Sequence, residues 1–257
     1  MIGRILAFIF GSMLGSFLNV CIYRMPKSES IIAPSSHCPV CNKPIAWYDN
    51  IPLLSFLLLG AKCRNCKQKI SGRYFLVELL TAALVLFLYL QLNLSFKFFI
   101  YTLIFSGLIV ASFIDLEYQI IPDEISLGGI ILGLAINGLF PHLQGFASFK
   151  QSLVFSVLGI LAGGSVLYVT GILGDFIFKK ESMGGGDIKL LAAIGAFLGW
   201  KAALIIFFMA PLFGAIMGLI VKIKQKISTI PYGPFLSLSA FITAFWGEKI
   251  VNWIFKY

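Results

Sequence analysis

Two aspartates attract attention because the chain has only 11 acidic residues. Asp115 lies in "LIVASFIDLEYQIIPDE" and Asp187 in "MGGGDIKLLAAIGAFLGW", each at one end of an apolar segment. Two carboxylates brought within a few ångströms of each other cannot both ionise cheaply, so they share a proton. One member can then draw a proton from water while the other protonates a departing amide nitrogen. Such a pair can hydrolyse a peptide bond without a metal ion or a nucleophilic serine.

Each aspartate also has a simpler interpretation, which the sequence leaves open. Asp187 precedes an apolar helix and could be its N-cap, a role worth about 1 kcal/mol. Asp115 is placed at a helix C-terminus, where the helix dipole disfavours negative charge, so stability explains it less well. Gly184, Gly185 and Gly186 allow positive φ values and a close approach of backbone or substrate to Asp187. A flexible loop is the alternative for these glycines.

The composition identifies a polytopic membrane protein. Hydrophobic residues make up 59% of the 257 residues, charged residues only 12%, and the mean hydropathy is +0.93. A soluble globule with a hydrated surface is therefore excluded. Comparing apolar runs with the roughly 20 residues that cross a bilayer predicts an all-α protein of about eight transmembrane helices. They are expected near residues 2–23, 75–93, 97–114, 125–140, 152–174, 188–200, 202–221 and 234–254.

The distribution of basic residues predicts the orientation of these helices. Eight of the 20 Lys and Arg residues lie in segment 24–73 alone. The positive-inside rule therefore places this segment in the cytoplasm and both termini outside. Asp115 then ends a helix arriving at the cytoplasmic face, and Asp187 begins one leaving it. We therefore expect a multi-pass membrane protein with both aspartates at the cytoplasmic face.

Four cysteines in segment 24–73 predict a metal site. Cys38 and Cys41 form one C-x-x-C motif, and Cys63 and Cys66 form a second. Four thiolates at this spacing suit tetrahedral Zn²⁺, which would stabilise a small segment with little core. Disulfides or free thiols are the alternatives, and a cytoplasmic location counts against disulfides. The predicted domains are helix 1–23, a zinc-binding loop 24–73 that includes "IPLLSFLLLG", and a protease core 74–257.

The motifs together resemble the type IV prepilin leader peptidases, which belong to the G-x-G-D intramembrane aspartyl proteases. "GGGD" at 184–187 matches the motif of the wider group. The other matching stretches are "GSFLNVCIYRMP" at 15–26, "CPVCNKPIAWYDNIPLLSFLLLGAKCRNC" at 38–66, "RYFLVE" at 73–78, "DLEYQIIPDE" at 115–124 and "PYGPFL" at 231–236. The resemblance implies eight transmembrane helices and a catalytic pair formed by Asp115 and Asp187.

The resemblance also implies the substrate and a second activity. Its substrates are prepilins and pseudopilins, whose short basic leader ends in glycine before a hydrophobic helix. Members with the large cytoplasmic loop typically also methylate the new N-terminal amine with S-adenosylmethionine, and this chain has the loop. It departs from the family pattern at Phe75, where proline is expected, and at Ala61, where glycine is commoner. Glu78, in "RYFLVE", is either a carboxylate at a helix N-terminus or a group near substrate or methyl donor.

A cluster of acids follows the third predicted helix on a face that is otherwise positive. Glu117, Asp123 and Glu124 have no basic neighbour in "DLEYQIIPDE", so we expect them to attract the basic leader of the substrate. Asp123 could equally cap the following helix. Lys189, beside Asp187, is also predicted to contact the substrate.

Three other functions compete with prepilin processing. A transporter or channel could use Asp115 and Asp187 as proton or cation sites, but would place them near the bilayer midplane. A non-catalytic assembly scaffold would not need the aspartates, and a related aspartyl protease could act on other membrane substrates. We expect partners among pilin-like proteins, secretion or DNA-uptake machines and membrane lipids, and no nucleic acid.

Overall fold

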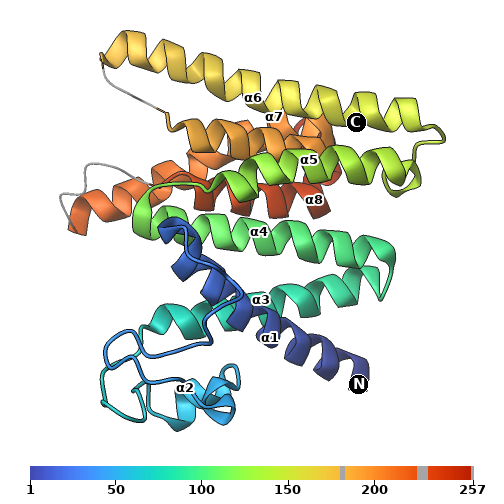
Figure 1. Ribbon diagram of the computed structural model, residues 1–257. Helices are drawn as coiled ribbons and strands as arrows, with labels where there is room; N and C mark the ends of the chain where they lie inside the picture. Colours follow the sequence, from blue (N-terminus) through green and yellow to red (C-terminus); the bar gives the residue numbers. More distant parts are fainter. Residues whose placement is uncertain (180–182, 225–230, 256–257) are drawn as a thin grey trace. The chain divides into compact units, whose positions relative to one another are not determined.

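The computed structural model describes residues 1–179, 183–224 and 231–255, and these residues are mostly helical (Figure 1). The described residues contain two isolated β-bridges and no strand. The α-helices are α1 (Ile2–Arg24), α2 (Leu54–Leu58), α3 (Gly72–Leu92), α4 (Phe96–Tyr118), α5 (Asp123–Leu139), α6 (Phe149–Phe178), α7 (Gly185–Lys224) and α8 (Gly233–Phe255). Short 3-10 helices, η1 (Met25–Lys27), η2 (Trp47–Asn50) and η3 (Pro141–Gln144), lie between them.

The helices confirm the predicted fold class of a helical membrane protein with a cysteine loop between its first two long helices. Five helices in the described part of the chain are long and apolar enough to span a membrane: α1, α3, α4, α6 and α7. The two spans predicted at 188–200 and 202–221 form one element, α7, which is interrupted at Gly199. Counted as two segments, α7 brings the long helical segments to the expected eight.

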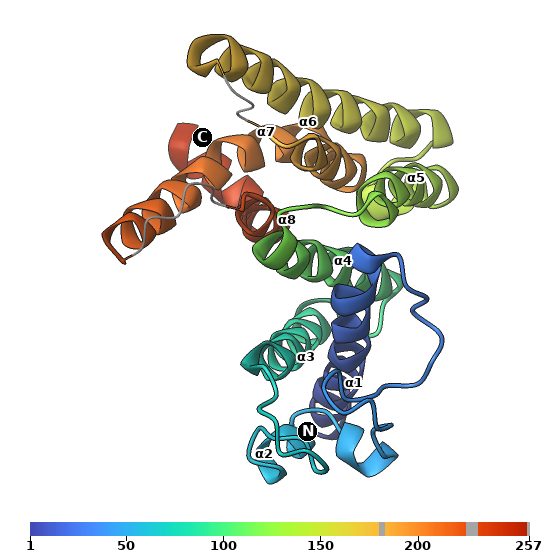
Figure 2. The ribbon, with the colours of Figure 1, turned by 60° about the vertical axis from the view of Figure 1, so that its left-hand side comes forward.

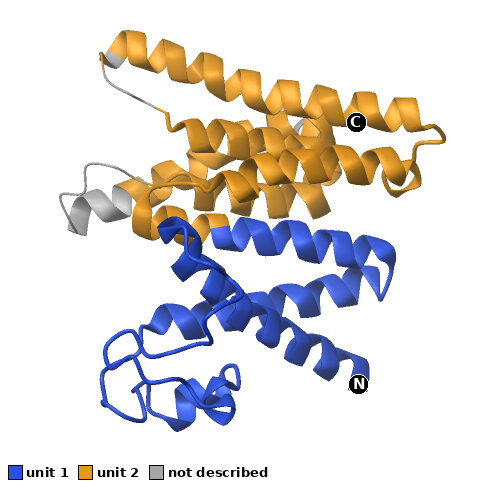
Figure 3. Cartoon of the chain, in the orientation of Figure 1, with its two compact units in different colours: residues 1–110 blue, residues 111–257 orange. Residues whose placement is uncertain are grey.

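The chain forms two compact units, residues 1–110 and 111–257, with α4 divided between them (Figure 3). In the first unit, α1 and α3 pack antiparallel through two glycines of α1. A Cβ on Gly11 would lie 2.8 Å from the Cα of Ala82, and one on Gly15 would lie 2.7 Å from the Cα of Glu78. Small residues let helix backbones approach closely where lipid supplies no hydrophobic driving force.

The second unit is built around the contact of α6 with α7. A Cβ on Gly159 would collide with the carbonyl of Gly195, and one on Gly163 would lie 2.5 Å from the carbonyl oxygen of Leu191. The two backbones therefore touch over two turns, and only glycine fits. α5 and α8 also pack against α7, which makes α7 the central helix of this unit.

The interruption in α7 is stabilised by side chains of other helices. Gly199 has φ 81° and ψ 173°, a conformation that glycine adopts readily and other residues rarely adopt. The helix α7 changes direction at this kink (Figure 2). The change frees carbonyls in the preceding turn that would be costly to bury without partners. Asn137 Nδ2 and Ser156 Oγ both donate to the carbonyl oxygen of Ala196 at 2.7 Å, and Gln144 Nε2 donates to that of Phe197 at 2.8 Å. The kink is thus a specified feature of the fold.

Candidate functional site

Asp115 is a buried carboxylate held by the backbone at the start of α8. It lies in the last turn of α4, which continues four residues further than predicted, to Tyr118. The side chain is 6% exposed, and its Oδ2 accepts a hydrogen bond of 2.8 Å from the N–H of Gly233. The N–H of Tyr232 also bonds to this carboxylate. A Cβ on Gly233 would lie 3.0 Å from Oδ2, so glycine is what permits this close approach.

Asp187 lies in the first turn of α7, and its carboxylate is under-satisfied. The helix begins at Gly185, two residues before the aspartate. The backbone N–H of Asp187 donates to the carbonyl of Gly184, but its buried Oδ1 has no hydrogen-bond partner among the described residues. The negative charge of Asp115 acts on the Asp187 carboxyl, so the two carboxylates lie within electrostatic range of each other. The carboxylate of a helix cap accepts hydrogen bonds from backbone N–H groups. Oδ1 of Asp187 accepts none from the described residues, so this oxygen does not cap the helix.

The three glycines before Asp187 differ in what surrounds them. A Cβ on Gly184 would lie 3.1 Å from Asp187 Oδ2, and one on Gly186 would lie 3.0 Å from the Cβ of Ile121. A Cβ on Gly185 would meet nothing within 4 Å. The expectation of positive φ is wrong, because the described glycines with positive φ are Gly60, Gly145 and Gly199. Close approach is therefore the steric reason for Gly184 and Gly186.

Tyr232 and Gly233 are site residues that the sequence reasoning did not select. Both lie in "PYGPFL", a stretch recognised only as part of the resemblance. Burial and the negative charge of Asp187 raise the pKa of the Tyr232 hydroxyl. This hydroxyl therefore stays protonated at neutral pH and is a hydrogen-bond donor near the carboxylates.

The predicted substrate-steering acids are exposed, and Asp123 is paired with a lysine. Asp123 Oδ1 accepts a hydrogen bond of 2.7 Å from Lys189 Nζ, so these two predicted residues contact each other. Pro122 occupies the N-cap of α5, and Asp123 is the first helical residue. Glu117 and Glu124 are exposed on either side of the turn between α4 and α5. The acidic surface therefore carries less negative charge than the sequence alone indicated.

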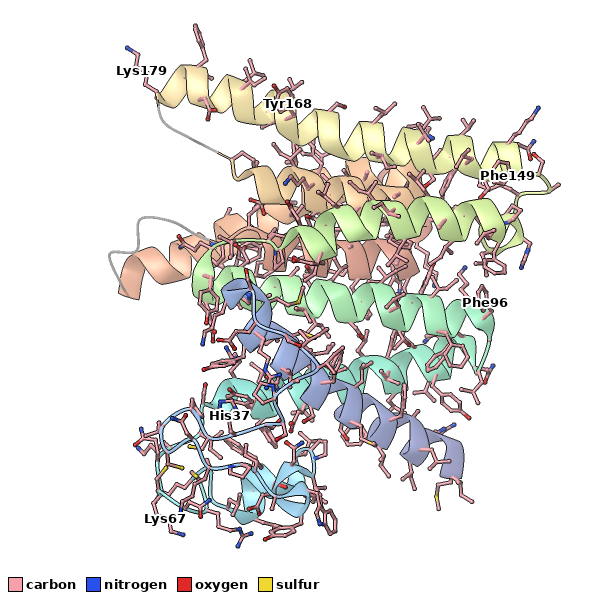
Figure 4. The ribbon with its side chains drawn as sticks, in the orientation of Figure 1. His37, Lys67, Phe96, Phe149, Tyr168 and Lys179 are labelled. Atoms are coloured by element: carbon pink, nitrogen blue, oxygen red, sulfur yellow. The ribbon has the colours of Figure 1, made fainter. Side chains whose placement is uncertain are left out.

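The four cysteines form one cluster in the first unit, close to Lys67 (Figure 4). The Sγ atoms of Cys38, Cys41, Cys63 and Cys66 all lie within 4.8 Å of one another, and those of Cys38 and Cys66 are 3.8 Å apart. Tetrahedral Zn–S bonds of about 2.3 Å place the sulfurs about 3.8 Å apart. All four cysteines are free, so the arrangement fits a metal ion and contains no disulfide.

The two C-x-x-C motifs adopt the same local structure. In each, the N–H of the first cysteine donates to a carbonyl just past the second cysteine, at Lys43 or Gln68. The residue after each second cysteine, Asn42 or Lys67, has positive φ and donates its N–H back to the first cysteine. An antiparallel bridge flanks each turn. These paired turns direct two sulfurs each toward a common point.

Electrostatics in this cluster also favour a bound cation. The N–H groups of Cys66 and Asn65 lower the pKa of Cys63 to about 7. An N–H of Gln68 has the same effect on Cys66, but desolvation and the neighbouring thiols raise the pKa of Cys66 to about 11. A thiolate at one cysteine thus disfavours ionisation of the neighbouring thiols until a cation is bound. His37 is outside the cluster, with Nδ1 3.2 Å from the carbonyl oxygen of Ser35.

Phe75 and Ala61, at which the resemblance predicts proline and glycine, have defined local environments. The ring of Phe75 packs against the ring of Phe56 with centroids 5.3 Å apart. Ala61 has φ 55°. Glycine adopts this left-handed conformation at lower cost than alanine, which is a physical reason to expect glycine here.

Comparisons with known proteins agree with these features. The bacterial peptidase A24 N-terminal domain family matches residues 9–92, and the type IV leader peptidase family matches residues 102–219. Relatives named prepilin leader peptidase/N-methyltransferase are 37% identical in Aeromonas hydrophila, 34% in Pseudomonas aeruginosa and 35% in Legionella pneumophila. The alignments cover 96%, 95% and 97% of this chain and 92%, 90% and 93% of those proteins.

No solved structure matches the chain. The two family matches fall in both units, and the similarity to the relatives extends over nearly the whole of each protein. The chain therefore belongs to the type IV leader peptidase family.

Proposed function

We propose that this protein is a bifunctional prepilin peptidase and N-methyltransferase. It removes the short basic leader of type IV prepilins and pseudopilins and methylates the new N-terminal residue. The names of its relatives support both activities, and the observation that carries the peptidase assignment is the juxtaposition of Asp115 and Asp187. Nothing in these similarities favours the alternative of a proton- or cation-coupled transporter.

The hydrogen bonds of the two carboxylates suggest a division of roles. Asp115 receives two backbone N–H groups, from Tyr232 and Gly233, which stabilise a negative charge on it. Asp187 Oδ1 has no donor among the described residues and is thus the better site for the shared proton. Asp115 would therefore take a proton from the attacking water, and Asp187 would protonate the departing amide nitrogen.

We assign the cysteine cluster to structural zinc. Four protein ligands complete a tetrahedral site and leave no position for substrate or water, as in structural zinc sites. The bound ion would tie the two C-x-x-C turns together and so define the loop. The domain boundaries we propose remain helix 1–23, zinc loop 24–73 and protease core 74–257.

The methyl donor we propose is S-adenosylmethionine, which supplies an electrophilic methyl group to the N-terminal amine. The described residues include no glycine-rich nucleotide-binding loop. No side chain is therefore assigned to methyl transfer.

The location we propose is the bacterial inner membrane, with the aspartates at the cytoplasmic face. Eight basic residues in segment 24–73 support this orientation. The acids Glu117, Asp123 and Glu124, with Lys189 beside Asp123, would meet the leader there. Candidate destinations of the processed substrates are type IV pili, type II secretion and DNA uptake.

Leader removal and N-methylation, both read by mass spectrometry, test this assignment in detergent. Wild type is compared with Asp115→Asn and Asp187→Asn, using a prepilin and S-adenosylmethionine as substrates. Each substitution keeps the shape of the side chain but removes its ability to take up or release a proton. We therefore expect cleavage to fall by about 10²–10⁴-fold. Asp175→Asn, at an exposed position on α6, is the matched control and should cleave at the wild-type rate.

Two further outcomes decide between alternatives. Methylation of a pre-cleaved substrate by the two inactive variants would place the transferase chemistry away from the aspartates. Wild-type cleavage by either variant would contradict the shared-proton mechanism and return Asp187 to the role of a helix cap.

A further inference from the structure

The cysteine loop has an apolar surface that the function described above does not use. It is formed by η2, α2 and the residues between them, and we call residues 51–58 of this part the anchor segment. The outward side chains of the anchor segment are exposed, with Leu58 85% exposed and Leu57 63% exposed. Ile51 and Leu54 are exposed as well, and Trp47 and Tyr48 of η2 precede them. An apolar surface of this kind marks an interaction site.

The opposite side of the anchor segment is fixed to α3. The N–H of Leu53 donates to Glu78 Oε2 at 2.7 Å, and Glu78 is only 9% exposed. Ser16 of α1 gives Glu78 a second hydrogen bond. The ring of Phe56 packs against Phe75 of α3. These contacts give Glu78 a structural role and leave Leu57 and Leu58 facing away from the protein.

The contacts with α3 define the depth of the anchor segment in the membrane. α3 has 21 residues and is therefore about 31 Å long, close to the hydrocarbon thickness of about 30 Å. The whole helix is needed to cross the bilayer. Phe75 and Glu78 lie about 5 Å and about 9 Å along it from its first residue. Interfacial helices insert to a similar depth of about 5–10 Å.

The charge around the anchor segment fits an anionic lipid surface. Segment 24–73 has eight basic residues and two acidic ones, Glu29 and Asp49. Asp49 is paired with Arg64, at 2.6 Å and 2.7 Å, and this contact lowers the pKa of the Asp49 carboxyl. Lys62, Lys67 and Lys69 follow the anchor segment in the chain, and basic residues near a membrane are attracted to anionic headgroups.

We infer that the anchor segment is inserted into the lipid leaflet crossed by the first turns of α3, with Leu57 and Leu58 among the acyl chains. The loop is then held at three points: by the cysteine cluster, by Glu78 and by lipid. Its run of apolar residues is too short to span the bilayer, and insertion from one side is the arrangement that its length permits. This inference is independent of the catalytic assignment.

Fluorescence quenching by brominated lipids tests the insertion. The other tryptophans are removed by Trp47→Phe, Trp200→Phe, Trp246→Phe and Trp253→Phe, and Leu58→Trp is introduced. The chain is reconstituted without substrate in bilayers brominated at shallow or deep acyl positions. We expect the Leu58→Trp signal to be quenched most by shallow bromines, because the anchor segment lies near the headgroup boundary.

Two matched variants calibrate the result. Leu80→Trp, outward on α3, is the lipid-facing reference. Val40→Trp is the control, because Val40 is 61% exposed but is held by the cysteine turn. We expect quenching of Leu58→Trp to be close to the reference and about twofold or more above the control. Circular dichroism and size-exclusion chromatography establish that each variant is folded.

The opposite results would overturn the inference. Quenching of Leu58→Trp no greater than that of Val40→Trp would place the anchor segment in water. Shielding from bromine with emission that changes on dilution would assign the surface to a second copy of the chain. Shielding with emission that changes only when a prepilin is added would assign it to the substrate.

Discussion

The cysteine cluster and the aspartate pair are built in opposite ways. Cys38 and Cys66 are 28 residues apart, and each C-x-x-C turn is formed by hydrogen bonds among its own neighbours. Asp115 is instead bound by Gly233, 118 residues away. Asp187, on a third helix, completes the pair. One site is local in sequence, and the other requires the helices of the second unit to be assembled.

The two sites also differ in how far their polar atoms are satisfied. The cysteine turns supply four converging sulfurs, enough for a closed metal site. Asp187 Oδ1 is buried and lacks a partner among the described residues. A buried carboxylate oxygen without a donor is costly and is expected where a substrate or water completes the site. A saturated site provides stability, and an unsaturated one is available for chemistry.

The largest expected effect is loss of the metal. Cys63→Ser removes one ligand, and structural zinc sites contribute about 10 kcal/mol or more to folding. We expect one zinc ion per wild-type chain and none in the variant, measured by elemental analysis, with rapid proteolysis of segment 37–70. Cys21→Ala, a buried cysteine of α1, is the control and should retain the metal. A metal-free variant with a protease-resistant loop would contradict the assignment.

The pH dependence of metal binding sharpens this prediction. Because the pKa of Cys63 is about 7 without metal, this ligand is already a thiolate above neutral pH. As the pH falls through 7, zinc must displace its proton as well, so zinc affinity should decrease more steeply below pH 7. Competition with a chromogenic chelator measures the slope. A slope unchanged through pH 7 would contradict the lowered pKa of Cys63 in the metal-free loop.

The second prediction separates the glycines before Asp187. A methyl group at Gly186 meets Ile121 at 3.0 Å, whereas a methyl group at Gly185 enters open space. We expect Gly186→Ala to reduce kcat by about 10-fold or more, because sub-ångström displacement of a catalytic group is costly. Gly185→Ala, the matched control, should keep kcat within about twofold. Equal loss in both variants would mean that flexibility matters more than close approach.

Features that are local in sequence could be predicted, and features formed by remote residues could not. The cysteine motifs and the aspartates were identified because residue type and spacing are visible locally. The carboxylate-binding N–H groups of Tyr232 and Gly233 were missed, since backbone donors have no sequence signature and their partner is remote. The continuity of α7 was missed because two short apolar runs look the same whether or not a kink joins them. Gly199 provides the backbone conformation of the kink. The side chains that donate to the freed carbonyls, Asn137, Ser156 and Gln144, come from elsewhere in the chain.

The third prediction tests that assembly directly. Asn137→Leu removes one donor to the Ala196 carbonyl but leaves Ser156 in place. A buried hydrogen bond lost in this way should reduce stability by about 1–3 kcal/mol. Thermal unfolding in detergent followed by circular dichroism measures the change, with Asn252→Leu, exposed on α8, as control. If both variants unfold like wild type, the kink does not depend on this bond.

The smallest expected effect concerns the acids beside the aspartate pair. Glu117→Gln with Glu124→Gln removes exposed negative charge, so the salt dependence of kcat/KM for a basic leader should become shallower, with a change of a few-fold at low salt.

Lys189→Met provides the opposite change in the same place. It releases Asp123 from its 2.7 Å contact and should make the salt dependence steeper. Glu248 is exposed on α8, about 22 Å along that helix from Gly233. Glu248→Gln is therefore the control and should change neither kcat/KM nor its salt dependence. Because steering acts on encounter and not on the chemical step, kcat should stay constant in all three variants. Changes of the same sign for both substitutions would mean that these residues act through local structure instead of charge.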